Sequence, residues 1–403
     1  VNDDIAPTLT IVKQVVNDNG GTASVANFGI TTSAGDLVFD GGNTVDDTTT
    51  YAATPLTGLT AGMPYSLAEQ DVADYSEGTW NCAPNVGGGA YDNGSVTLRP
   101  GEAATCPNVT DDLSPSLTVV KKVVNDNGGT ATVADFGLTS SAGTLVFGGG
   151  STAADTTSYT AALTDLTAGV PYSLAELDVA GYSEGGWDCS PNDGGGLFGS
   201  GEVTLALGEA ATCTIINDDI TPTLTVIKEV DNQFGGSAVS ADFTIEVNAN
   251  NPSQASFPGA AAPGTTITLD AGVFSVSESG LPAGYQLNSA SADCAGSIAP
   301  GENKTCTLVN GDTDGNTSLV LNKVLIKDNG GTAMESDWTL QATDGITTLE
   351  GPGGPGSIDV QSGADFPVGT YTLSEFDGPD GYSASPWSCV GGTFNPGTSQ
   401  LEL

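Results

Sequence analysis

The sequence has no histidine and only eight lysine and arginine residues, against 49 aspartate and glutamate residues. The net charge of −41 repels nucleic acid and acidic membrane surfaces, which excludes both as partners. Without histidine, the usual zinc sites and histidine-based acid–base groups are also excluded. The sequence contains neither a nucleophile elbow nor a phosphate-binding loop. We therefore expect no enzyme and no organic cofactor.

Long apolar runs and segments of helical periodicity are also lacking, so we expect no direct membrane insertion. Instead, 56 glycines and many threonine, valine and alanine residues predict short strands joined by turns, an all-β fold. The chain has neither a signal peptide nor a sorting tail and opens at Val1-Asn2-Asp3-Asp4, which reads as the end of a repeat. We interpret it as a mature or partial ectodomain.

One stretch of alternating apolar residues with a central lysine occurs four times, at residues 8–21, 116–129, 223–236 and 318–331. The four lysines carry half of the positive charge of the chain: Lys13, Lys121, Lys228 and Lys323. They are about 100 residues apart, the length of a β-sandwich domain. Because alternate residues of a strand share a face, each lysine is predicted to point inward among apolar neighbours. A buried ammonium group needs a partner.

Short acidic junctions divide the chain between the lysine strands. We predict a tail or linker at 1–4 and repeats at 5–112, 113–219, 220–311 and 312–403, the last without its closing strand. Short junctions predict domains that sit end to end with limited bending. Each lysine strand is followed by an Asn-Asp-Asn-Gly-Gly turn or a variant of it, which favours a hairpin.

Two cysteines in each complete repeat predict three disulfides in an oxidising compartment: Cys82 with Cys106, Cys189 with Cys213, and Cys294 with Cys306. A metal site is disfavoured, because no Cys-x-x-Cys pair is present. Each disulfide would add about 3 kcal/mol through loop closure. Cys389 is left over because the fourth repeat stops early. Either the protein continues, or another chain supplies the closing strand, or the thiol is free and reactive.

Partners for the lysines come from two later strands. An aromatic-x-aliphatic-x-Glu motif ends in Glu69, Glu176, Glu278 and Glu375, and alternation turns each glutamate inward. The closing strands add Asn217 and Asn310 on the faces of their cysteines. Two interpretations remain open, a buried ion pair with an asparagine hydrogen bond and a covalent Lys–Asn amide. For the amide, burial would lower the lysine pKa and raise that of the glutamic acid.

These motifs resemble the collagen-adhesin B-type, or prealbumin-like, domains of bacterial surface proteins and pilin shafts. The resemblance covers all four repeats and is best in the Glu…Gly-Tyr segment from Ser277 to Tyr285. It implies Greek-key, Ig-like β-sandwiches, an extracellular location and intramolecular isopeptide bonds. Residue by residue, it implies the bonded pairs Lys121–Asn217 with Glu176, and Lys228–Asn310 with Glu278.

The other two repeats depart from this pattern. Repeat one has Thr110 where asparagine is needed, and Asn108 lies one strand step away, about 6.6 Å. We therefore expect no Lys–Asn amide in repeat one, where Lys13 and Glu69 remain as a buried pair. Repeat four lacks the closing strand, which leaves Lys323 and Glu375 as a pair without asparagine.

Aspartates at the junctions offer the hard oxygen ligands that Ca²⁺ prefers. The set comprises Asp3, Asp4, Asp111, Asp112, Asp218 and Asp219. We expect the pairs to face the turns of neighbouring repeats, so that Asp111 and Asp112 would meet Asp126. The competing interpretation is ordinary turn and capping chemistry.

Two functions fit these observations. The first is a structural stalk or filament subunit at a microbial cell surface, with self-association or neighbouring subunits as partners. The second is an adhesin that binds a sugar or protein through variable segments such as 248–263 and 351–363. Phe257 is the only aromatic residue in those segments, which favours the structural function.

Overall fold

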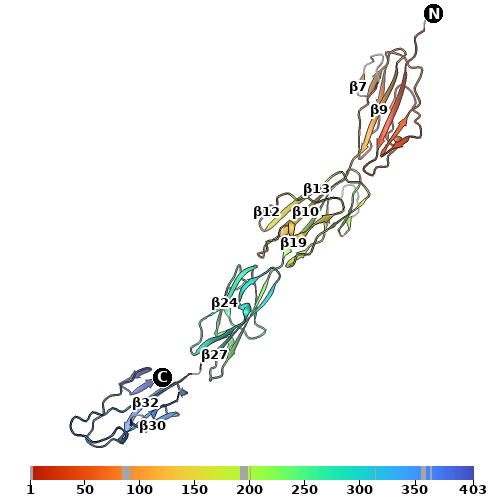
Figure 1. Ribbon diagram of the computed structural model, residues 1–403. Helices are drawn as coiled ribbons and strands as arrows, with labels where there is room; N and C mark the ends of the chain where they lie inside the picture. The colour runs from red at the N-terminus through yellow and green to blue at the C-terminus, as the bar shows by residue number, and fades with distance from the viewer. Residues whose placement is uncertain are drawn as a thin grey trace.

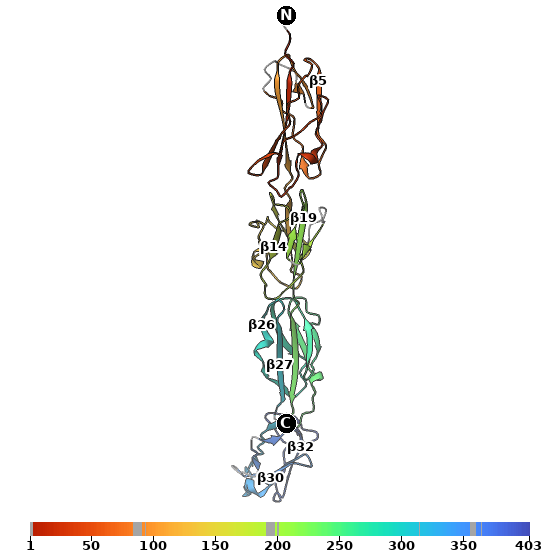
Figure 2. The same ribbon diagram turned by 90° about the vertical axis from the view of Figure 1, so that its right-hand side faces the viewer.

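The computed structural model describes residues 3–83, 91–92, 94–190, 198–199, 201–313, 315–354, 360–363 and 365–403. Four β-sandwich domains follow one another in an elongated array, with the N-terminus at one end and the fourth domain at the other (Figure 1, Figure 2). This confirms the predicted all-β fold of four tandem domains. Within the described residues, no helix is both long and apolar enough to span a membrane.

The first domain packs two sheets. One has the order β3-β4-β1-β9-β6 and the other β2-β5-β8-β7. Strand β1 is antiparallel to β4 but parallel to β9, so the first and last long strands of the domain lie side by side. The bounds are β1 (Thr8–Val16), β2 (Thr31–Thr32), β3 (Asn43–Val45), β4 (Thr48–Ala52), β5 (Pro64–Ala68), β6 (Tyr75–Ser76), β7 (Tyr91–Asp92), β8 (Ser95–Thr97) and β9 (Ala103–Asp112).

The second domain repeats this plan with sheets β12-β13-β10-β19-β15 and β11-β14-β18-β17, and β16 also pairs with β19. The lysine strand β10 is again parallel to the closing strand β19. The bounds are β10 (Ser116–Val124), β11 (Thr139–Ser140), β12 (Ser151–Ala153), β13 (Thr156–Leu163), β14 (Pro171–Ala175), β15 (Tyr182–Glu184), β16 (Asp188–Cys189), β17 (Phe198–Gly199), β18 (Glu202–Thr204) and β19 (Ala210–Asp219).

The third domain has four strands in each sheet, in the orders β23-β20-β27-β25 and β22-β21-β24-β26. Strands β20 and β27 are its parallel pair. The bounds are β20 (Thr223–Asp231), β21 (Thr244–Asn248), β22 (Ser256–Pro258), β23 (Thr265–Thr268), β24 (Gly272–Ser279), β25 (Tyr285–Ala290), β26 (Ala295–Ile298) and β27 (Asn303–Asp312).

The fourth domain keeps one full sheet, β30-β29-β32-β34-β33, and a short pair, β28-β31. Among the described residues, its lysine segment forms no strand and is paired through an isolated bridge between Val320 and Gln361. The bounds are β28 (Asn316–Thr317), β29 (Thr339–Thr343), β30 (Thr348–Pro352), β31 (Phe366–Pro367), β32 (Thr370–Phe376), β33 (Thr393–Asn395) and β34 (Gln400–Glu402).

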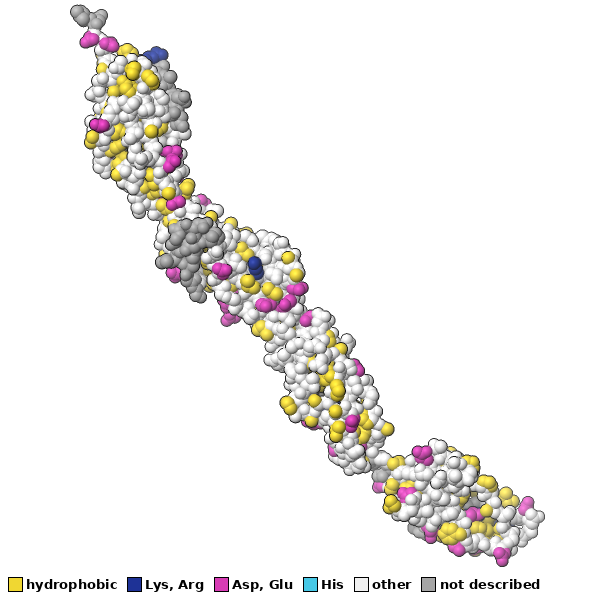
Figure 3. Space-filling model, turned by 180° about the vertical axis from the view of Figure 1, so that it is seen from behind, with side chains coloured by type: hydrophobic (Ala, Val, Ile, Leu, Met, Phe, Trp, Pro, Cys, Tyr) yellow, Lys and Arg dark blue, Asp and Glu magenta, His cyan; other side chains and the backbone are white. Residues whose placement is uncertain are grey.

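Each core lies between the two sheets, and alternation along the lysine strand decides what enters it. In β1 every second residue is buried, which places Lys13 in line with Leu9, Ile11 and Val15. The same pattern buries the lysine of β10. Basic side chains are therefore sparse on the surface in Figure 3, since three of the eight are inside.

The prediction of a hairpin after the lysine strand was wrong. The antiparallel neighbour of β1 is β4, and the turn leads instead into a short 3₁₀ helix. The reason is that turn N–H groups donate to an aspartate at the end of the parallel closing strand, which fixes the turn from outside. The helices are η1 (Val25–Phe28), η2 (Val133–Phe136), η3 (Ser240–Asp242) and η5 (Glu335–Asp337), while η4 (Ala292–Cys294) lies near the third disulfide.

The ends of the closing strands suggest where domains meet. Strand β27 includes Asp312, one residue beyond the limit of 311 expected for the third repeat. We propose that the junctions follow Asp112, Asp219 and Asp312, because each of these residues still pairs within its own domain.

We predict that G129A destabilises the second domain. An added Cβ would lie 2.2 Å from the hydroxyl of Tyr182, and overpacking of this kind costs about 1–3 kcal/mol. Hydrogen exchange of the full chain should show faster opening of β10 and η2. G148A is the matched control, since nothing lies within 4 Å of its Cβ. Equal exchange in the two variants would contradict the prediction.

Candidate functional site: a buried lysine in each domain

The lysine of the second domain has two polar partners. Lys121 is fully buried, and its Nζ lies 2.5 Å from Oε2 of Glu176, which follows β14 in the opposite sheet. The ammonium also donates to Oδ1 of Asn217 on the closing strand. The ring centroid of Phe136 in η2 lies 3.9 Å from Nζ. Both sheets and the short helix thus converge on one amine.

The third domain holds the same three groups more loosely. The Lys228 Nζ lies 2.9 Å from Oδ1 of Asn310 and 3.3 Å from Oε1 of Glu278. It also donates to the backbone oxygen of Glu229 at 2.7 Å. The ring centroid of Phe243 is 4.4 Å away.

In the first domain the lysine reaches further than expected. Its Nζ lies 2.5 Å from Oε2 of Glu69 and 2.6 Å from Oδ1 of Asn108, and it also contacts the Thr110 hydroxyl. Asn108 lies one strand step from Thr110 on β9, but Lys13 stands directly opposite Asn108 in the parallel ladder and contacts both residues. The amide nitrogen of Asn108, however, donates to the carbonyl of Gly78 at 3.0 Å.

The fourth lysine has a simpler environment. Lys323 Nζ lies 2.6 Å from Oε2 of Glu375 and 4.8 Å from the Trp338 ring centroid. Its side chain is 13% exposed, whereas the other three are fully enclosed. Among the described residues, no asparagine reaches it.

Burial lowers the pKa of Lys13, Lys121 and Lys228 below the ordinary value. The glutamate of each domain opposes this shift through its charge and its hydrogen bond, without cancelling it. A lowered pKa increases the fraction of neutral amine, the nucleophilic form.

Several buried polar atoms in these sites have no hydrogen-bond partner. They are Oε1 of Glu176, Oε2 of Glu278 and Nδ2 of Asn310, while Oε1 of Glu278 has its ion pair with Lys228 in place of a hydrogen bond. An unsatisfied buried group costs about 1–3 kcal/mol. The arrangement places an amine, a carboxyl group and a carboxamide together out of water, the groups needed for amide exchange.

One cysteine of each disulfide lies on the closing strand that also carries a polar partner of the lysine. Three disulfides join Cys82 to Cys106, Cys189 to Cys213 and Cys294 to Cys306. Cys389 is a half-buried free thiol, and burial raises its pKa.

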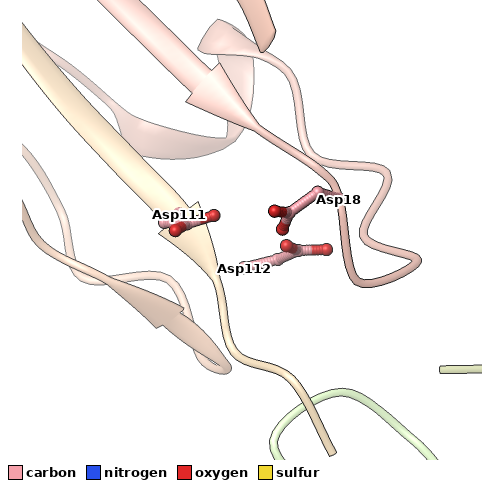
Figure 4. A group of neighbouring side chains, drawn as sticks. All are labelled: Asp18, Asp111 and Asp112. Carbon is pink, nitrogen blue, oxygen red and sulfur yellow. The ribbon is translucent and has the colours of Figure 1, made fainter. Parts of the chain in front are cut away.

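Acidic residues cluster at the far end of the same strands. Figure 4 shows Asp18 from the turn facing Asp111 and Asp112 from the end of β9. Their carboxylate oxygens lie within 4.8 Å of one another, as do those of Asp126, Asp218 and Asp219.

The predicted meeting of Asp111 and Asp112 with Asp126 of the next repeat was wrong. Each cluster lies within one domain, because parallel pairing brings the end of the closing strand to the turn after the lysine strand. Asp3 and Asp4 are exposed and belong to neither cluster. The third repeat has Gly311 and Gln233 in the other acidic positions.

The buried member of each cluster anchors the turn, as the interpretation of these aspartates as turn and capping residues predicts. Asp112 accepts from the N–H groups of Asn19 and Gly21, the latter at 2.6 Å. Asp219 and Asp312 do the same in their domains. Carboxylates at this spacing could bind Ca²⁺. Turn anchoring already accounts for the buried aspartates.

We predict that D18N stabilises the first domain at pH 7 in the presence of a chelator. The pKa of Asp18 is raised by partial desolvation and by Asp112 and Asp111, so the folded state holds its proton more tightly than the unfolded chain. The resulting penalty is complete above the raised pKa and disappears below the ordinary value of 3.8. Calorimetry should show a higher melting temperature at pH 7 and no gain near pH 3. D36N removes an exposed charge elsewhere and is the control; an equal gain in both would refute the cluster effect.

Comparison with known proteins supports the fold assignment. A family model described as a prealbumin-like fold domain matches residues 4–107, 112–215, 219–313 and 314–403. No curated protein sequence is significantly similar to the chain.

Solved structures with a related fold have low identity and low TM-scores, so they carry no functional argument. The Bacillus anthracis TIE protein is 14% identical with a TM-score of 0.36, and the match covers 100% of this chain and 66% of that protein. Two B repeat units of the collagen-binding protein of Staphylococcus aureus are 15% identical with a TM-score of 0.23, covering 94% and 96%. The Streptococcus pyogenes major pilin T-13 is 14% identical with a TM-score of 0.23, covering 54% and 98%. Because the family model covers nearly the whole sequence in four copies, the chain belongs to the prealbumin-like fold domain family.

Proposed function

We propose that the protein is an extracellular structural element of a microbial cell surface, a stalk or a filament subunit. The observation that carries this proposal is a repeated hydrogen-bonded clip between successive domains. The three disulfides and the four matches to the prealbumin-like fold domain add support.

The first clip joins domains one and two through the turn and the linker. The carbonyl of Asn19 accepts from the N–H of Ala168 at 2.8 Å. The linker residue Leu113 donates to the carbonyl of Asp74 and accepts from the N–H of Gly208. The linker is therefore hydrogen-bonded to the first domain through its N–H group and to the second domain through its carbonyl group.

The second clip repeats these contacts at equivalent positions. The carbonyl of Asn127 accepts from Ala271 at 2.7 Å, and Ile220 donates to Gly181 and accepts from Gly301. Two junctions with the same bonds would resist bending, as an array under tension requires.

The third junction is looser among the described residues. Phe234 replaces the clip asparagine and is 58% exposed. The linker still donates from Thr313 to the carbonyl of Gly284 and accepts at Gly315 from the N–H of Val368, but no described bond joins the turn at Phe234 to the fourth domain. We therefore propose two stiff junctions followed by one that bends more easily.

Isopeptide bonds would strengthen the second and third domains. The neutral Nζ of Lys121 or Lys228 would attack the side-chain carbonyl carbon of Asn217 or Asn310. The neighbouring glutamic acid would polarise the carbonyl and carry the amine proton to the departing nitrogen. A C–N bond forms, a C–N bond breaks and ammonia leaves. In the third domain this would remove the unpartnered amide nitrogen.

The first domain would keep its ion pair. Asn108 has its amide nitrogen held by Gly78, and the Thr110 hydroxyl lies 3.3 Å from both Glu69 and Asn108. Glu69 therefore meets the threonine at the position where Asn217 stands in the second domain.

No observation on the described residues favours the adhesin alternative. Phe257, the aromatic residue of segment 248–263, is buried in the core of the third domain. Segment 351–363 lies partly outside the described residues.

We predict that the intact mass of the chain, corrected for three disulfides, is lower than calculated by two ammonia molecules. E176A should raise the mass by one ammonia, because the acid that assists Lys121 is absent. Cross-linked peptides should identify the bond that remains in the third domain. E202A removes an exposed carboxylate of the same domain and should keep both bonds. The full calculated mass in the unmodified chain would contradict the isopeptide proposal.

We predict that G20A and G128A loosen the first and second junctions. An added Cβ would lie 2.7 Å from the carbonyl of Ala168 or 2.6 Å from that of Ala271. Distances between spin labels on adjacent domains should broaden. G235A is the matched control, because it has the same positive φ but nothing within 4 Å. Unchanged distributions in G20A and G128A would refute the clip.

A further inference from the structure

The turns at the first two junctions have the same local sequence. Residues 15–23 and 123–131 both read Val-Val-Asn-Asp-Asn-Gly-Gly-Thr-Ala. Each turn contains an asparagine directly followed by a glycine, at Asn19 and at Asn127. Because glycine has no Cβ, its backbone nitrogen is the least hindered nucleophile that can follow an asparagine. Ring closure onto the side chain is therefore equally favourable in the two sequences, and any difference in its rate comes from the surrounding structure.

This ring closure is an intramolecular substitution. The backbone nitrogen of the glycine loses its proton and bonds to Cγ of the asparagine, the Cγ–Nδ2 bond breaks, and the side-chain nitrogen takes up a proton and leaves as ammonia. Water then opens the cyclic imide at one of its two carbonyl groups. Opening at Cγ gives aspartate. Opening at the main-chain carbonyl gives isoaspartate, in which the chain runs through the former side chain and is longer by one carbon atom.

Hydrogen bonds hold the leaving nitrogen in both turns. Nδ2 of Asn127 donates to a carboxylate oxygen of Asp126 and to the carbonyl of Asp219, the latter at 3.2 Å. Asn19 makes the matching bonds within the first domain. Ring closure pulls the carboxamide away from these partners, so the folded turn opposes the reaction.

The interdomain clips fix the other reacting group. The carbonyls of Asn19 and Asn127 accept from the N–H groups of Ala168 and Ala271, at 2.8 and 2.7 Å. Each of these carbonyls belongs to the same peptide group as the attacking glycine nitrogen. A closed clip therefore holds the nucleophile in place, and the reaction requires local opening of the junction.

One contact distinguishes the two sites. The hydroxyl of Thr221, in the linker to the third domain, donates to Oδ1 of Asn127 at 2.8 Å. The corresponding linker residue of the first junction is Ser114, and within the described ranges no group donates to Oδ1 of Asn19. The carboxamide of Asn127 is thus held at its nitrogen and its oxygen, whereas that of Asn19 is held at its nitrogen alone.

We propose that Asn19 and Asn127 are sites of a spontaneous modification that converts a stiff junction into a loose one, and that the Thr221 hydroxyl slows it at the second junction. Aspartate puts a carboxylate where Nδ2 donated to carboxylates, and like charges repel. Isoaspartate moves the carbonyl that accepts the clip bond. Both products weaken the clip, so the first junction loosens before the second. This inference rests on the clips of the proposed function and is independent of the isopeptide bonds.

The test follows both sites in the 403-residue chain during incubation at mildly alkaline pH. Peptide mapping by mass spectrometry measures ammonia loss and the aspartate and isoaspartate products in each turn. We expect Asn19 to react about fivefold faster than Asn127, the factor that one hydrogen bond provides. A synthetic peptide of residues 123–132 gives the rate without the fold, and both sites of the folded chain should react more slowly than this peptide.

Variants of the linker identify the cause of the difference. T221A removes the hydroxyl and should raise the rate at Asn127 to that at Asn19. T221S keeps a hydroxyl and is the matched control, so it should react like the unmodified chain. Asn19 in the same molecules reports any general loss of stability and should be unaffected. Equal rates at the two sites of the unmodified chain, or equal acceleration of both sites in T221A, would overturn the proposal.

Distances between spin labels on adjacent domains separate this inference from the proposed function. Labels across the first junction should give a narrow distribution in the fresh chain and a broader one after Asn19 has reacted. A distribution that stays narrow after complete reaction would refute the loosening. A distribution that is already broad in the fresh chain would instead contradict the clip itself, while the order of the two reaction rates still decides the role of Thr221.

Discussion

The parallel pairing of the lysine strand with the closing strand is the constraint on which each complete domain depends. It joins the beginning and the end of the domain sequence in the middle of one sheet. Along this pair lie the disulfide cysteine, the buried lysine with its polar partners and the aspartate that anchors the turn. One register therefore fixes the disulfide, the lysine site and the aspartate at the domain end. A slip of one residue would turn all three to the wrong face.

In the fourth domain, the described residues hold no closing strand beside the lysine segment. Its lysine segment has the same kind of sequence, yet it does not form a strand among the described residues. Lys323 keeps its glutamate but is more exposed than the other lysines. A strand is stabilised by backbone partners on its edges, so intrinsic preference alone does not impose it.

The distribution of charge follows from the same architecture. The surface is strongly acidic, while three of the scarce cations are enclosed in apolar cores. Burying an ammonium group is costly, and each domain offsets the cost with a glutamate from the opposite sheet and an aromatic face from the short helix. The glutamates link the two sheets, and the short helix closes over the lysine. The Asn-Asp-Asn-Gly-Gly turn serves two domains at once, since it is anchored by its own closing strand and contacts the next domain.

The sequence by itself determined the fold class, the fourfold repeat and the inward face of the lysine. Period-two alternation and repeated spacing are local properties that the chain carries without its partners. It could not determine which aspartates meet which turn, how far Lys13 reaches, or that a short 3₁₀ helix comes after the glycine-rich turn. Those depend on the parallel register between strands almost a hundred residues apart, on a lysine side chain long enough to contact two rungs of the ladder, and on the contact of each turn with the following domain. Only the tertiary structure brings these groups together, because no local pattern records the distance between the two ends of a domain.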